Sequence, residues 1–216
     1  MIALRSMTAR DLPRLRELDT SFESDAVLEL HRAGVGLEVH WSLVERRLAA
    51  PEPGRCYDLL ASDLRELGRR LAAGQGLYLV AEEEGRIVGA LDLERTAWNN
   101  TAWLWNLLVD RPHRRRGIGR RLFGRAVEYC RRRRVRAILI ETQSNNLPAC
   151  RFYAALGCEL AGLNEALYSN QDVERNEVAL FWAYRVDDDA PGAPWLMDRS
   201  LSFVRPLAND GDLYLS

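Results

Sequence analysis

Apolar and polar residues change their spacing several times along this 216-residue chain, and each change marks a predicted element. Short apolar or alternating runs bounded by turn residues are typical of β-strands, whereas apolar residues three or four positions apart favour an amphipathic helix. On this basis we predict strands at residues 2–7, 77–81, 87–94, 103–109, 135–142, 160–163 and 178–185.

Helices are predicted between several of these strands. Thr8 and Asp11 resemble a variant capping box, and they precede a helix that carries Leu12, Leu15 and Leu18. Ser62 is expected to cap a helix that Gly74 closes. A helix at 147–156 should stop at Gly157, and a longer one at 117–133 buries every fourth residue: Ile118, Leu122, Ala126 and Cys130.

The segment from residue 20 to 60 has the weakest pattern. We expect a polar stretch with two glycines, a helix at about 39–48, and Pro51 and Pro53 as breakers.

The order of elements predicts an α/β fold with one mixed, mostly antiparallel sheet, because an antiparallel meander precedes a helix crossover into a parallel strand. Residues 187–194, an acidic segment rich in Pro and Gly, interrupt the pattern. We therefore expect one domain at 1–186 and a tail at 187–216.

Composition excludes several classes of function. The net charge of −1 and pI near 6.3 argue against nucleic-acid binding, and no apolar run is long enough to span a membrane. Neither the four cysteines nor the three histidines have metal-ligand spacing, so no metal site is expected. We expect reduced thiols and a cytoplasmic location.

One segment predicts an anion site. The strand that ends at Leu107, Leu108 and Val109 runs into an arginine-rich turn and then a helix. A helix start presents free N–H groups and a positive dipole, and glycine lets a phosphate approach the backbone. The chain has no lysine for a Walker loop, and Leu122 replaces the third glycine of a dinucleotide fingerprint. The predicted cradle consists of Arg114, Arg115, Arg116, Gly117, Ile118, Gly119 and Arg120.

A second polar cluster follows the next strand. Glu141 lies near the end of that strand, Asn146 in the loop and Tyr153 in the following helix. Ligands collect beyond the carboxyl ends of parallel strands, so this cluster and the cradle should lie at the same edge of the sheet.

Arg-x-x-Gly-x-Gly at Arg114–Gly119 and Asn-x-x-Ala-x-x-Phe-Tyr-x-x-x-Gly at Asn146–Gly157 resemble the GCN5-related N-acetyltransferase (GNAT) superfamily over about residues 76–185. This resemblance implies a central sheet with helices on both faces and acetyl-CoA (coenzyme A) as the cofactor. The loop would hold the pyrophosphate, and Asn146 the pantetheine arm. Leu107, Leu108 and Val109 would offer that arm a free backbone edge. The alternative is an ordinary core strand, and the side chains of these residues are expected in the core in both cases.

The resemblance also suggests catalytic roles. Glu141 is the candidate base, although a carboxylate at a strand end is often solvated or ion-paired. Tyr153 is the candidate acid, with packing against the sheet as its alternative, and Asn146 could equally cap a helix. Asn106 occupies a position that is often acidic in relatives. Because its side-chain amide cannot act as a base, the asparagine favours Glu141 in that role.

A narrower resemblance concerns the acceptor. Residues 139–143, 168–170 and 177–184 are similar to the streptothricin N-acetyltransferases, which implies a small cationic amine acceptor. Protein N-terminal acetylation and a non-catalytic acyl-CoA-binding module remain alternatives, and a homodimer stays open. An acidic approach to the site is expected from Asp92, Glu94, Glu141 and Glu165.

Overall fold

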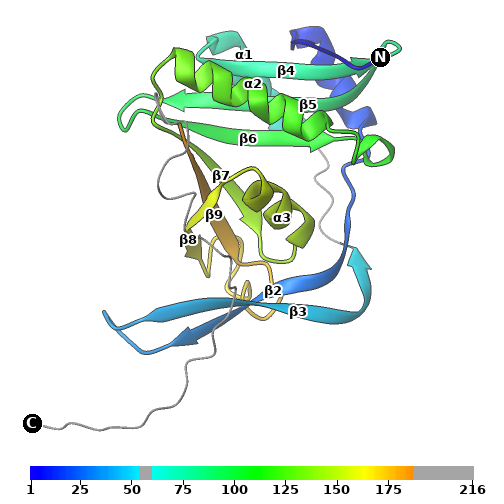
Figure 1. The fold of residues 1–216 in the computed structure, drawn as a ribbon. Helices are drawn as coiled ribbons and strands as arrows, with labels where there is room; N and C mark the ends of the chain where they lie inside the picture. Colours follow the sequence, from blue (N-terminus) through cyan, green and yellow to red (C-terminus); the bar gives the residue numbers. More distant parts are fainter. Residues whose placement is uncertain (54–59, 187–216) are drawn as a thin grey trace, which may run out of the picture.

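The computed structural model describes residues 1–53 and 60–186, so the predicted tail at 187–216 and Cys56 lie outside the described residues. A seven-stranded sheet forms the centre, and β2 and β3 form a separate two-stranded sheet at one end (Figure 1). The helical elements are η1 (Ala9–Glu17), α1 (Ala61–Ala73), η2 (Arg111–His113), α2 (Ile118–Arg132) and α3 (Leu147–Ala155). The strands are β1 (Ala3–Ser6), β2 (Glu23–Ala33), β3 (His40–Pro53), β4 (Gly76–Glu83), β5 (Arg86–Thr96), β6 (Thr101–Val109), β7 (Ala137–Gln143), β8 (Glu159–Asn164) and β9 (Ala179–Arg185).

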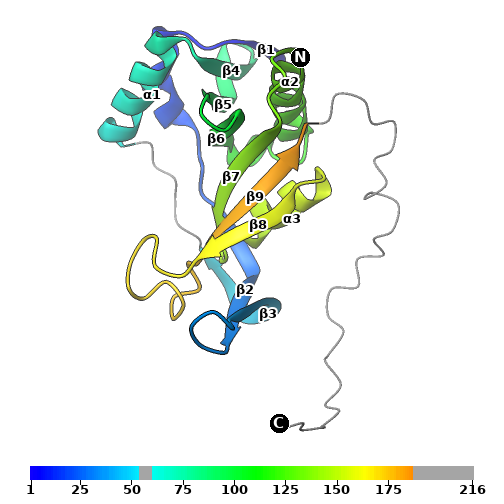
Figure 2. The same cartoon turned by 90° about the vertical axis from the view of Figure 1, so that its left-hand side faces the viewer.

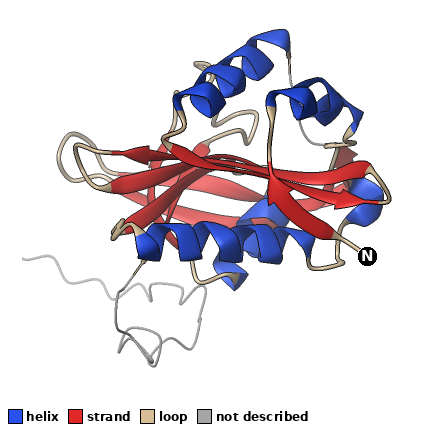
Figure 3. Ribbon diagram, turned by 90° about the horizontal axis from the view of Figure 1, so that it is seen from above, coloured by secondary structure: helices blue, strands red, loops and turns tan. Residues whose placement is uncertain are grey.

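The large sheet is mixed and mostly antiparallel, as predicted. Its strand order is β1-β4-β5-β6-β7-β9-β8, and β6 and β7 form its parallel pair, connected by α2. Figure 3 shows helices on both faces of the sheet. The predicted fold class is therefore confirmed.

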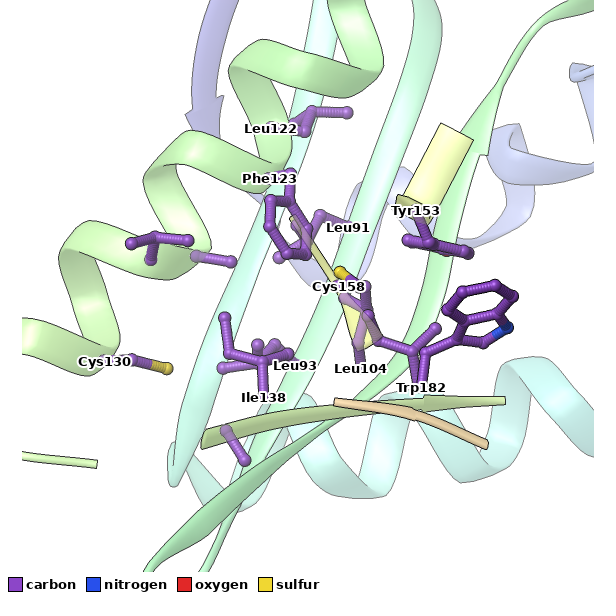
Figure 4. Packing of buried hydrophobic residues seen from close by; sticks show 14 of the residues in the cluster. Leu91, Leu93, Leu104, Leu122, Phe123, Cys130, Ile138, Tyr153, Cys158 and Trp182 are labelled. Atoms are coloured by element: carbon purple, nitrogen blue, oxygen red, sulfur yellow. The ribbon is translucent and has the colours of Figure 1, made fainter. Parts of the chain in front are cut away.

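Each face of the sheet has its own apolar cluster. The predicted apolar face of α2 is buried, and it packs over Leu91, Leu93, Leu104 and Ile138 of the strands beneath it (Figure 4). Burial of such a side chain stabilises the fold by about 1.5–3 kcal/mol. On the opposite face, η1 and α1 cover a smaller cluster.

The predicted capping box is present at the start of η1. The Asp11 carboxylate accepts the backbone N–H of Thr8 at 2.8 Å and the Thr8 hydroxyl at 2.9 Å. It also accepts two hydrogen bonds of 2.8 Å from the Arg5 guanidinium. These bonds hold the pKa of Asp11 well below its usual range, even though burial opposes the shift.

The helix predicted at 39–48 is wrong, because this segment belongs to β3. Strand β3 pairs with β2 from His40 opposite Ala33 to Arg47 opposite Ala26, so long-range pairing overrides the local pattern. The register then shifts, and the pairing resumes at Glu52 opposite Ser24. Pro51 falls in the irregular part and Pro53 at the strand end, where a missing N–H is tolerated.

Ser62 is not the cap of α1. The N-cap is Leu60, whose backbone N–H donates to the Asp63 carboxylate at 2.9 Å, and Ser62 lies in the first turn. Gly74 ends the helix with φ +67°, as its predicted role requires.

Candidate active site

The main feature of the site is the place where the pairing between β6 and β7 ends, which we call the opening. Their parallel pairing runs from Thr101–Ala137 to Leu104–Ile140 and stops there, although β6 continues to Val109. The divergence begins at a bulge, because Leu104 pairs with Leu93 of β5 whereas Asn106 pairs with Asp92. A bulge bends its strand and increases its twist, so the end of β6 turns away from β7.

The backbone of Leu107, Leu108 and Val109 borders this opening. These residues keep their pairing with β5, up to Val109 opposite Gly89. Their other edge faces the side on which the pairing with β7 has ended. The end of β6 therefore has no β7 partner beyond Leu104, and this edge could accept an extended molecule as an added strand, as the resemblance implies.

The loop after β6 leads into the N-terminus of α2. Gly117 is the N-cap of this helix and has φ +79°, a conformation that favours glycine. The first hydrogen bond of the helix runs from the Arg121 N–H to the Gly117 carbonyl at 3.0 Å. The N–H groups of Ile118, Gly119 and Arg120 come before that bond, so this helix start is suited to an anion.

The arginines of the loop differ in their contacts within the protein. Arg114 donates to the carbonyls of Val109 at 3.1 Å and Ser21 at 2.7 Å. Arg116 forms a two-point ion pair with Glu83, at 2.7 and 2.8 Å. A guanidinium has five N–H donors, so these contacts orient Arg114 and Arg116 and still leave donors that could bind a phosphate. Arg115 and Arg120 are exposed.

Gly119 has a packing role that the sequence did not reveal. A Cβ atom at this position would lie 3.1 Å from Cζ of Phe152 and 3.7 Å from Cγ2 of Val109. The absence of a side chain thus lets α3 approach the start of α2.

Glu141 lies on β7 opposite Phe181 of β9 and accepts a hydrogen bond from the Tyr168 hydroxyl. Its side chain points away from α2, because its neighbour Ile140 belongs to the cluster under that helix. The backbone N–H of Tyr168 is fixed by Asp172 at 2.9 Å. Residues 168–170 belong to the sequence resemblance, but nothing in the sequence pattern identifies Tyr168 as the partner of Glu141.

Tyr153 lies on the other side of the sheet. It is buried on α3, stacks edge-to-face on Phe152 with 5.3 Å between ring centres, and belongs to the cluster that contains Ile140 and Trp182. Figure 4 shows Tyr153 and Trp182 at one end of that cluster. Glu141 and Tyr153 therefore flank the opening from opposite faces of the sheet.

Asn146 caps α3, which confirms one of its two predicted roles. Its side-chain oxygen accepts the Ala149 N–H at 3.2 Å, and the residue is buried. The adjacent Asn145 has a buried Oδ1 atom that accepts no hydrogen bond in the described part of the chain. A buried acceptor without a donor is costly, so this atom is suited to receive an N–H group of a ligand.

The four carboxylates expected to form an acidic approach lie in different environments. Asp92 is only 1% exposed, pairs with Arg70 and accepts from Asn106 at 3.1 Å, so the expectation is wrong for this residue. Glu94 accepts from the indole N–H of Trp105 at 3.2 Å. Glu165 accepts from the indole of Trp41 at 2.6 Å, which places it beside β3.

Within residues 1–53 and 60–186, no group of three His, Cys, Asp or Glu side chains could hold a metal ion. No helix of these ranges is long and apolar enough to cross a membrane. Cys130, Cys150 and Cys158 are free and buried, and burial raises the pKa of Cys150 to about 11 and of the other two to about 12.

Comparison with known proteins places this geometry in a family. Residues 41–158, which include the loop, Glu141 and Tyr153, match the acetyltransferase (GNAT) family. The chain belongs to this family. Enzymes of the GNAT family take their acetyl group from acetyl-CoA, in agreement with the cofactor predicted from the loop.

Within the GNAT family, the chain is similar to streptothricin acetyltransferases. The chain is 31% identical to streptothricin acetyltransferase A of Bacillus subtilis (strain 168) over 147 residues, which cover 67% of this chain and 80% of that enzyme. It is 34% identical to the streptothricin acetyltransferase of Escherichia coli over 106 residues, 48% of this chain and 60% of that enzyme. This second match therefore spans less than two thirds of its relative. The crystal structure of nourseothricin acetyltransferase superposes with a TM-score of 0.72 at 25% identity, covering 86% of this chain and 99% of that one.

Proposed function

We propose that this protein transfers the acetyl group of acetyl-CoA to a primary amine of a small cationic molecule of the streptothricin type. The observation that carries the proposal is the opening between β6 and β7, which has Glu141 on one face and Tyr153 on the other. The similarity to two streptothricin acetyltransferases supports the choice of acceptor.

The residues around the opening suit coenzyme A. The first N–H groups of α2 and the left-handed Gly117 would hold the pyrophosphate, with nothing within 4 Å of the position that a Cβ of Gly117 would occupy. The edge of Leu107, Leu108 and Val109 would pair with the pantetheine arm, whose amide N–H groups could satisfy Oδ1 of Asn145. When bound, the cofactor supplies an activated acetyl thioester.

Glu141 would accept the proton of the attacking amine at its carboxylate. The Tyr168 hydroxyl, which donates to Oε1 of Glu141, holds the carboxylate in a defined orientation. Asn106 donates its amide N–H to Asp92 and so takes a structural role. This arrangement leaves Glu141 as the base at the acceptor side of the opening.

Tyr153 would donate its hydroxyl proton to the departing thiolate. Its packing against Phe152, beside the first turn of α2, fixes the ring on the cofactor side of the opening. A positioned acid of this kind contributes about 10²–10⁴-fold to a rate.

A thiol-release assay with acetyl-CoA tests the proposal on a panel of streptothricin, aminoglycosides, polyamines and N-terminal peptides, with product masses as a second readout. We expect streptothricin to give the highest kcat/KM and a product with one added acetyl group. Selective acetylation of the peptides would replace this function with protein N-terminal acetylation. Tight acetyl-CoA binding without transfer to any acceptor would indicate a non-catalytic module.

A further inference from the structure

We infer that Trp103, Trp105 and Phe181, bordered by Glu94, form a subsite for a second cationic group of the acceptor, distinct from the amine that is acetylated. We call these four residues the aromatic platform. The inference rests on the proposed function and adds a requirement for a second positive charge in the acceptor.

Strand register places the platform on the same face of the sheet as Glu141. Glu94 of β5 pairs with Trp103 of β6, which pairs in turn with Leu139 of β7. Glu141, two residues after Leu139, pairs with Phe181 of β9. Paired residues and residues two apart in a strand point to the same side, so these side chains share one face. In Figure 2, α1 lies beside the β4 end of the sheet on this side, whereas β7, β8 and β9 carry no helix there.

The aromatic rings form a continuous surface. The ring centres of Trp103 and Trp105 are 5.8 Å apart, and those of Trp103 and Phe181 are 6.2 Å apart. Trp105 is 50% exposed, although an indole is usually well buried. The surface thus extends from the β6 bulge to the strand beside Glu141.

Two polar contacts hold Trp105 in place. The Arg70 guanidinium lies 4.9 Å from the centre of the Trp105 ring and is paired with the buried Asp92. The Trp105 indole N–H donates to Glu94 at 3.2 Å. The charge of Arg70 is balanced by Asp92 and by Glu66, which lies 3.4 Å from it, so the local charge beside Trp105 is net negative with Glu94 included.

Such a surface favours a cation. Indole and phenyl faces attract positive charge, and a nearby carboxylate strengthens that attraction. The strand spacing puts Glu94 and Glu141 roughly 12 Å apart, since two strand intervals and two residues separate them. An acceptor whose second cation lies about 10 Å from its reactive amine could therefore occupy both positions.

The experiment measures kcat and KM for streptothricin, for a polyamine and for a monoamine, in wild type and in Trp105→Ala. Trp98→Ala is the matched control, because Trp98 is 87% exposed in the turn between β5 and β6. We expect Trp105→Ala to raise KM about 3- to 30-fold for the multiply charged acceptors, as typical cation–π energies imply. The KM values for the monoamine and for acetyl-CoA should stay unchanged, and Trp105→Phe should restore part of the loss.

Calorimetric titration of both proteins with the same compounds separates this inference from the proposed function. Acetylation of streptothricin with the same KM in Trp105→Ala overturns the platform and leaves the function intact. Trp105-dependent binding of polyamines without acetylation of streptothricin overturns the function and supports the platform. If wild type neither acetylates nor binds any cation of the panel, both proposals are wrong.

Discussion

The two faces of the opening between β6 and β7 are built in different ways. The proposed cofactor face consists of local backbone features, namely the left-handed Gly117 and the N–H groups that precede the first hydrogen bond of α2. The acceptor face consists of side chains from four strands and from the loop that carries Tyr168. The first kind of surface suits a cofactor that many enzymes share, whereas the second can change one residue at a time and so can set specificity.

The largest effect should come from the acid on the cofactor face. Tyr153→Phe removes only the proton donor, so we expect kcat to fall about 10²–10⁴-fold while the affinity for acetyl-CoA stays nearly constant. Steady-state kinetics with saturating substrates measure this change. Tyr129→Phe is the matched control, because Tyr129 is also buried but lies on α2 and contacts Arg133. Wild-type turnover in Tyr153→Phe would return Tyr153 to a packing role.

Glutamate at the loop glycines should weaken coenzyme A binding on the order of 100-fold, because it combines backbone strain or a clash with a negative charge at the anion site. Gly117→Glu is strained by φ +79°, and Gly119→Glu would collide with Phe152. Gly124→Glu, in the same helix with nothing near its Cβ position, is the control. Calorimetry gives the affinities and thermal melts report any loss of folding. Unchanged affinity in both folded variants would refute the cradle.

The base assignment belongs to the acceptor face and is tested by pH. Glu141→Gln should lower kcat most near neutral pH and recover partly at alkaline pH, because an amine with an ordinary pKa near ~10.4 then needs no base. A Glu141 that only positions the cation predicts a raised KM and a kcat deficit that does not shrink with pH. Full pH–rate profiles of both proteins distinguish the two roles.

A smaller effect concerns stability at the edge of the sheet. Asp11→Asn should lower the free energy of unfolding by about 1–3 kcal/mol at pH 7, because it weakens the bonds to Arg5 and Thr8. The folded-state pKa of Asp11 lies below its usual value of 3.8, so this stabilisation is present above that pH and is lost as the pH falls further. Denaturant titrations of both proteins at pH 7 and below pH 3.8 should show the difference narrowing in acid. A constant difference would contradict the linkage.

The smallest effect should separate two arginines of the cofactor loop. Arg114→Ala breaks bonds to two backbone carbonyls and should lower both coenzyme A affinity and stability, by about 1–2 kcal/mol. Arg115→Ala should reduce affinity alone, since Arg115 is exposed in a left-handed turn. Equal melting temperatures for wild type and Arg114→Ala would show that Arg114 does not brace the loop.

The contrast between local backbone features and side chains brought together by several strands also explains how much could be predicted from the sequence. The glycine turn before α2, the apolar face of α2 and the capping box depend on residues close together in the chain, and the structure has all three, while the anion-binding role of the turn stays a prediction. The helix predicted at 39–48 is wrong because this segment is held in the β2–β3 hairpin, whose pairing joins residues up to 30 positions apart, such as Glu23 and Pro53. The bond from Tyr168 to Glu141 was missed for the same reason. The prediction that Asp92 contributes to an acidic approach is wrong because Asp92 pairs with Arg70 of α1, and the sequence pattern of β5 does not reveal this contact.

The close approach of Phe152 to Gly119 connects the proposed cofactor loop to the helix that carries the proposed acid. Phe152 rests against the first turn of α2, and its neighbour in the chain is Tyr153. We therefore expect a shift of that turn to move the residue proposed to protonate the thiolate. A substitution that shortens Phe152 should uncouple the two, so that donor affinity and turnover no longer vary together across a series of loop variants.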